Sequence, residues 1–130
     1  MLDNFDAYLC HCRMCQRATG GLSVAFAGVA TAGFQWHCEP EWYQSSAIAR
    51  RPFCRECGTP LGFQYIDVDH KLDITVGSFD DPSKFVPTSH FGVEARHEAW
   101  LDTRGLPEMR CDEYGSLVER WENSGQDMPE

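Results

Sequence analysis

The stretch "CHCRMCQRATGG", residues 10–21, places Cys10, Cys12 and Cys15 within six consecutive positions. Thiols at this spacing indicate a metal site, a redox relay or a coincidence of composition. A CxCxxC run can place all three sulfurs around one ion, which leaves the fourth position of a tetrahedral zinc site open for catalysis. The rest of the sequence has to decide among these interpretations.

A second cluster, "FCRECGTPL" at residues 53–61, carries Cys54 and Cys57 at CxxC spacing with a glycine directly after them. This spacing is typical of a zinc-binding turn, and no βαβ pattern supports redox chemistry instead. From spacing alone, Cys12 and Cys15 would join Cys54 and Cys57 in one closed four-cysteine zinc site that only stabilises the fold. Because that site leaves Cys10 unused, the closed and the open arrangement remain alternatives.

The residues after Cys15 favour thiolates, the form of cysteine that binds zinc. "QRATG" predicts a short helix that ends at Gly20, and the amides at its start would face the sulfurs. Arg13 and Arg17 add positive charge to the same stretch. We therefore expect bound metal at neutral pH.

Composition narrows the function classes. The 130 residues suffice for one domain with a core of its own, and the net charge of -9 disfavours nucleic acid and anionic membranes as partners. The start "MLDNFDAY" does not resemble a signal peptide, and no stretch reaches about 18 apolar residues. We expect a cytoplasmic protein, in which clustered cysteines favour metal over disulfides.

Short apolar segments separated by Pro, Gly and Asp predict a mainly β fold. In residues 71–79, Leu72, Ile74 and Val76 alternate with polar or small residues, as in a strand with one wet face. Besides the helix after Cys15, residues 113–122 predict a second one. We expect one domain over residues 1–122 and a flexible tail over 123–130. The expected strands lie at residues 22–30, 34–38, 41–44, 47–53, 61–66, 71–79 and 89–95, and "FDDPSKFVP" at 79–87 is read as a separator.

With "CHCRMCQRATG", "FCRECGTPL", "GSFDDPSKFVPTSHF" and "AWLDTRGLP" in this order, the sequence resembles the glutathione-dependent formaldehyde-activating enzyme family, whose relatives include centromere protein V. The resemblance covers about residues 8–107. It implies a β-tent fold of small antiparallel sheets around zinc-cysteine sites, with one or two short helices. It also implies a carbon-sulfur lyase activity like that of S-(hydroxymethyl)glutathione synthase, with glutathione and formaldehyde as substrates.

The resemblance assigns Zn2+ with an open position to Cys10, Cys12 and Cys15, which would be the catalytic residues. It assigns Cys54 and Cys57 to half of a separate structural zinc site, whose other half is a CxC upstream of the run. Here "MLDNFDAYL" precedes Cys10 and contains no cysteine. A truncated start, a lost structural zinc and a rearranged site are the three explanations.

Two further cysteines are spare, Cys38 and Cys111, and an isolated cysteine is expected to pack as a small hydrophobe. If the upstream hairpin is absent, a sheet edge is uncovered. Another surface, or a second subunit of a homodimer, is then expected to cover this edge.

In the expected mechanism, glutathione enters the open position as a thiolate. His11 is either a proton shuttle or a spacer between ligands, and His90 is expected to be a satisfied core or edge histidine. Arg50 and Arg51 are either a pair on a strand or the partners of the glutathione carboxylates. The alternative function is a non-catalytic binding module stabilised by one closed four-cysteine zinc site.

Overall fold

The structure, a computed structural model, describes residues 5–129 and divides into two compact units. The first unit extends to Glu98 and contains the whole sheet, and the second begins at Ala99 and contains one α-helix. None of the helices formed by these residues combines the length and the apolar character needed to cross a membrane. The limits of a single domain at residues 1–122 stay a prediction.

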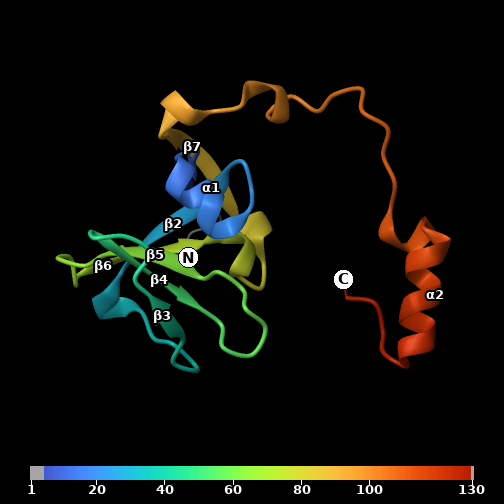
Figure 1. Ribbon diagram of the computed structural model, residues 1–130, viewed down its shortest axis with the longest axis horizontal. Helices are drawn as coiled ribbons and strands as arrows, with labels where there is room; N and C mark the ends of the chain where they lie inside the picture. Colours follow the sequence, from blue (N-terminus) through green and yellow to red (C-terminus); the bar gives the residue numbers. More distant parts are fainter. Residues whose placement is uncertain (1–4, 130) are drawn as a thin grey trace. The chain divides into compact units, whose positions relative to one another are not determined.

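Seven strands and two α-helices make up the regular structure (Figure 1). The strands are β1 (Phe5–Cys10), β2 (Val24–Ala30), β3 (Glu41–Tyr43), β4 (Ala49–Phe53), β5 (Gly62–Tyr65), β6 (Lys71–Thr75) and β7 (Phe85–Phe91). The helices are α1 (Arg13–Thr19) and α2 (Gly115–Ser124). Short 3-10 turns lie at Thr31–Gly33, Val76–Ser78, Pro82–Lys84, Val93–Ala95, Glu98–Trp100 and Cys111–Glu113.

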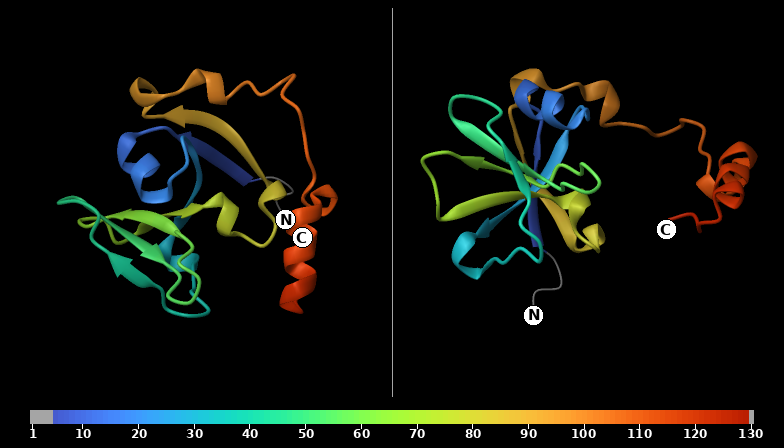
Figure 2. Two further views of the ribbon diagram at one scale, coloured as in Figure 1. Left: turned by 45° about the vertical axis from the view of Figure 1, so that its right-hand side comes forward. Right: turned by 60° about the horizontal axis from the view of Figure 1, so that its bottom comes forward.

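The strands are hydrogen-bonded in the order β3-β4-β5-β6-β2-β1-β7. The end of the sheet formed by β1 and β7 diverges from the end formed by β3 and β4 (Figure 2). All neighbours are antiparallel except β1 and β7, which pair in parallel with a register shift between Ala7 and Tyr8. The mainly β fold with two helices is therefore confirmed, with one parallel pair among the antiparallel ones.

Two small apolar clusters form the core on β1 and β2. Ala7 and Ala27 pack with Val76 in the first, and Phe26 packs with Cys10 and Cys15 in the second. Phe26 is only 1% exposed, so the largest buried side chain of the core lies directly against two of the clustered cysteines. The contacts that pack this part of the core are therefore also the contacts that position Cys10 and Cys15.

Several expected elements are confirmed and others are wrong. The helix after Cys15 ends at Gly20, whose φ of 78° forms the left-handed cap that glycine favours. No strand forms at residues 34–38, whereas β1 and the first half of β7 were not expected. Pro87 made the β7 segment look like a separator, but this strand is at the end of the sheet, where proline is tolerated.

The expectation of a wet face on residues 71–79 is also wrong. Strand β6 is central in the sheet, and Asp73 and Thr75 are as buried as Leu72 and Ile74. The alternation of polar and apolar residues therefore reflects a polar interior rather than solvent. Thr75 satisfies its hydroxyl by donating to the carbonyl of Pro60, 2.8 Å away. Asp73, by contrast, has a side-chain oxygen, Oδ1, without a hydrogen-bond partner among the described residues.

The close approach of β5 and β6 makes a first prediction possible. A Cβ at Gly62 would overlap the backbone carbonyl oxygen of Asp73, whereas one at Gly77 would meet nothing within 4 Å. Gly62→Ala should therefore lower the free energy of unfolding by about 1–3 kcal/mol, because the two strands must separate. Urea unfolding measures it, with Gly77→Ala as the matched control. Equal midpoints for the two variants would contradict the strand packing described here.

Candidate metal and thiol site

The three clustered cysteines come from the end of β1 and the start of α1. Cys10 is the last residue of β1 and pairs with Phe91 of β7 and Val24 of β2. Cys12 caps α1, because its sulfur accepts a hydrogen bond from the backbone amide of Cys15 at 3.3 Å. The chain turns at this cap, so that the side chain of Cys15 in the first turn of α1 approaches that of Cys10 at the end of β1.

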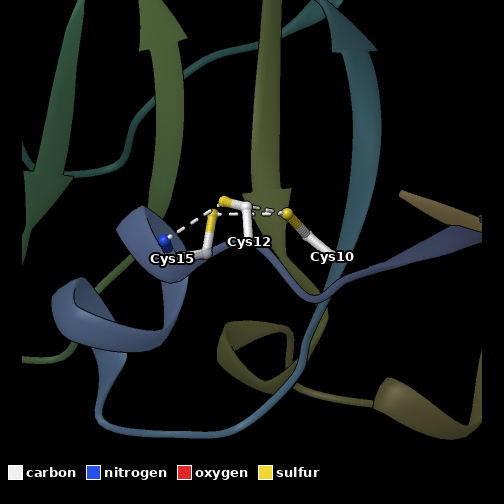
Figure 3. Close-up of side chains that lie close together, drawn as sticks. All are labelled: Cys10, Cys12 and Cys15. Atoms are coloured by element: carbon white, nitrogen blue, oxygen red, sulfur yellow. Dashed lines mark hydrogen bonds between the residues drawn. The ribbon is translucent and has the colours of Figure 1, made fainter. Parts of the chain in front are cut away.

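The sulfur atoms of these residues converge (Figure 3). The Sγ atom of Cys10 lies 3.5 Å from that of Cys12 and 3.5 Å from that of Cys15. All three ligand atoms lie within 4.8 Å of one another. Sulfurs around a tetrahedral zinc ion, with Zn–S bonds of about 2.3 Å, are about 3.8 Å apart. The donor set and its spacing therefore fit zinc.

Charge in the cluster is distributed unevenly among the thiols. A hydrogen bond from Cys10 is the largest influence that lowers the pKa of Cys15 to about 5, against the opposing effect of burial. The Arg51 guanidinium, which donates to the Cys15 sulfur at 3.5 Å, acts in the same direction. The same hydrogen bond and burial raise the pKa of Cys10 above its usual range. One thiolate is therefore favoured before any cation binds.

The cation at the cluster was not the one expected from the sequence. Arg13 and Arg17 are nearest to Cys15 in the chain, but residues two positions apart do not share a face of a helix. Arg51 comes from β4, 36 positions away, and is 8% exposed. Only the pairing of strands brings it to the sulfur, so local sequence carried no signal for its role.

A buried glutamine fixes the backbone around the cluster. The side-chain amide of Gln16 donates to the carbonyls of His11, Ala95 and Leu22 at 2.8, 3.2 and 3.3 Å. Gln16 is 4% exposed, so its amide makes these contacts inside the protein. The side chain thereby ties the cysteine loop to the segment that follows β7.

His11, between Cys10 and Cys12 in the chain, has a buried side chain. It is 1% exposed, and its Nε2 atom lies 2.8 Å from Nδ1 of His90 on β7. Burial, and then the neighbouring His90, lower the pKa of His11. His90 is exposed on an edge strand, where the sequence expected either a core or an edge histidine. Of the two rings, His90 is the one that reaches the cavity described next.

A cavity of about 340 Å³ opens onto the three cysteines. This volume is at the small end of ligand pockets. Its walls combine phenylalanine and tyrosine rings with the three cysteines and several polar side chains. The lining residues that matter here are Phe26, Phe63, Phe91, Asp73, Lys71 and Ser89.

Asp73 is the unusual member of this wall. It is 8% exposed, its Oδ1 atom has no hydrogen-bond partner among the described residues, and the nearest cation is Lys71 Nζ at 3.9 Å. Burial raises the pKa of Asp73 and, together with the nearby Asp73 carboxyl, raises that of Tyr8. A buried acceptor without a partner leaves the cavity able to receive a donor group of a ligand.

Cys54 and Cys57 form a turn of their own. The amide of Gly58 donates to the carbonyl of Cys54 at 2.8 Å, and the amide of Cys54 donates to the carbonyl of Thr59 at 3.0 Å. Within residues 5–129, no group of three or more possible ligands includes either sulfur. The closed site of Cys12 and Cys15 with these two cysteines is thus not assembled. The turn fits half of a metal site, and its role as zinc ligand stays a prediction.

The remaining residues singled out in the sequence lie elsewhere. Cys38 and Cys111 are both exposed, so the expectation that they pack as small hydrophobes is wrong. Arg50 stacks on Trp42 at 4.0 Å and donates to Gln64. Its guanidinium is therefore occupied within the sheet and is absent from the cavity wall.

The mainly β fold and the converging thiols beside a small cavity place the chain in the class of cysteine-rich, metal-binding β proteins. The family model described as glutathione-dependent formaldehyde-activating enzyme matches residues 2–95, and the chain belongs to this family. None of the curated proteins compared with the chain matches it. Family membership and the cysteine cluster together indicate a zinc-binding protein.

Removal of one thiol tests the metal centre. Cys10→Ser should reduce zinc affinity by more than about 100-fold, since even loss of a hydrogen-bond partner of a ligand costs 10–100-fold. Zinc per chain, measured by mass spectrometry after dialysis against a graded chelator, reports the change. Cys38→Ser, at an exposed cysteine, is the control. Equal affinity in both variants would exclude Cys10 as a ligand.

Gln16→Met tests the support of the loop. The substitution keeps the length of the side chain but leaves three carbonyls without their donor, so we expect a loss of about 1–3 kcal/mol in the free energy of unfolding. Gln44→Met, at an exposed position, is the matched control. Chemical denaturation of both variants measures the difference, and an unchanged Gln16→Met protein would refute the supporting role.

Proposed function

We propose that this protein is a zinc-dependent enzyme that joins a small aldehyde to a thiol such as glutathione, in the manner of S-(hydroxymethyl)glutathione synthase. The observation that carries the proposal is the convergence of three thiols at the wall of a cavity. Three protein ligands leave a fourth position for substrate, which is the arrangement of catalytic rather than structural zinc. Membership of the formaldehyde-activating family supports the same reaction.

The chemistry is an addition without redox change. The sulfur of the thiol forms a bond to the aldehyde carbon, the carbon–oxygen π bond breaks, and the thiol proton ends on the new hydroxyl group. The reverse reaction is the carbon-sulfur lyase step. When bound by Cys10, Cys12 and Cys15, zinc would supply a positive centre that favours a thiolate at neutral pH.

The other residues act on substrate position and on protons. Phe26, Phe63 and Phe91 supply apolar wall against which the carbon atoms of a substrate can pack. His90 lines the cavity and has Nδ1 engaged by His11, so its Nε2 atom is left for proton exchange with substrate. The proton-shuttle role, one of the two alternatives for His11, passes in this proposal to His90, with His11 orienting its ring.

Exchange spectroscopy tests the activity despite the spontaneous reaction. With ¹³C-formaldehyde and glutathione at equilibrium, zinc-loaded protein should increase the exchange rate between free and thiol-bound carbon by at least about 10-fold over buffer, equivalent to ~1.4 kcal/mol. Chelation of the metal and Cys12→Ser should both return the rate to that of buffer. Cys111→Ser, at an exposed cysteine, should leave it unchanged.

A second variant protects this test against misfolding. Ser89→Phe would fill the cavity from an exposed position without altering any thiol. It should slow exchange while zinc content stays at the wild-type level. A wild-type rate no faster than buffer, with zinc bound, would contradict the proposed activity.

A further inference from the structure

A second groove lies along α1, with a volume of about 530 Å³. Three arginines line it: Arg13 and Arg17 from the helix and Arg51 from β4. Tyr43 and Ser45 complete its polar wall, and no aspartate or glutamate lines it. The groove is therefore a concentration of positive charge in a chain whose net charge is -9.

Within residues 5–129, these arginines form no ion pair with a carboxylate, although Arg51 contacts the Cys15 sulfur. The five ion pairs within residues 5–129 use Arg55, Lys71, Arg96, Arg104 and Arg110. None of the three groove arginines takes part in an ion pair in this part of the chain. The chain has 20 acidic residues, yet Arg13 and Arg17 have no ion-pair partner among the described residues, and this points to an anion from outside.

The helix explains why two of them face the groove instead of the thiols. Arg13 and Arg17 are four positions apart and share one face of α1, from which Cys15 is turned away. Arg13 also donates to the side-chain oxygen of Gln16 at 2.7 Å, which orients its guanidinium. Their charge is thus directed into the groove.

Arg51 provides the buried end of the groove. It is 8% exposed, and its Nε atom has no hydrogen-bond partner among the described residues. One of its other nitrogens reaches the Cys15 sulfur at 3.5 Å. A buried donor without a partner is costly unless a ligand or water satisfies it.

The groove adjoins the thiol cavity. Met14, which follows Arg13 on α1, lines both spaces. A molecule whose sulfur lies at the cysteines can therefore extend past the flexible Met14 side chain to the arginines. The requirement on that molecule is an acidic group a short distance from its thiol.

We propose that this groove binds a carboxylate of the thiol substrate and thereby selects acidic thiols such as glutathione over neutral ones. The inference rests on the proposed function, since it concerns the substrate of the same site. Guanidinium groups hold carboxylates by paired, charge-assisted hydrogen bonds, and the arginines of the groove supply such donors. The sequence had offered Arg50 and Arg51 for this purpose; here Arg13 and Arg17 replace Arg50.

The test uses a ligand without a free thiol, so that it does not depend on the chemistry of the site. S-Methylglutathione and its diethyl ester differ in the charge of their carboxylates, and any effect of the added ethyl groups would persist in the arginine variants. Isothermal titration of the zinc-loaded full chain should show about 10-fold tighter binding of the acid, with an advantage that falls as salt is added. Arg13→Met and Arg17→Met should each reduce this preference to about 3-fold or less.

Controls and outcomes separate this inference from the proposed function. Arg120→Met, in the second unit and outside the groove, should keep the full preference. Equal affinity of the acid and the ester for the wild-type chain would overturn the inference, and so would a preference that both groove variants retain. If the preference holds and depends on the groove arginines, the inference stands even where formaldehyde exchange fails.

Discussion

Three sulfur atoms held about a van der Waals contact apart impose a charge constraint on the whole domain. The sulfurs cannot all be thiolates without a nearby cation, because like charges in a partly buried site repel one another. Among residues 5–129, only Arg51 contributes positive charge by direct contact with a sulfur, at Cys15. The remaining imbalance is what a divalent metal would relieve. Core packing, helix capping and the buried glutamine all serve to keep the thiols in this arrangement.

Local sequence was sufficient for the parts of the site that are local in the chain. The spacing of Cys10, Cys12 and Cys15 predicted one cluster, and Gly20 predicted the end of the helix, because both depend on residues within one or two turns. Strands with clear apolar runs, such as β2, were also predictable. These features follow from backbone geometry that neighbouring residues determine.

Long-range pairing determined what the sequence did not reveal. Asp73 looked like the wet side of a strand, but coverage of β6 on both faces buried it in the cavity wall. Arg51 was expected either in a pair with Arg50 on a strand or at the glutathione carboxylates, but β4 carries it to the thiols. β1 has only six residues, with Asp6 at its second position, and its strand character comes from lying between two partners.

The parallel pairing of β1 with β7 gives the site a particular order of assembly. Phe5 pairs with Phe85, so the chain must close a loop of about 80 residues before this side of the cavity exists, and such distant contacts form slowly. The three thiols, by contrast, lie within six residues and need only one helical turn to meet. Convergence of the thiols is thus encoded in a short peptide, whereas the β7 side of the cavity wall depends on the complete topology. Two features that lie at the same place in the folded protein therefore make very different demands on chain closure.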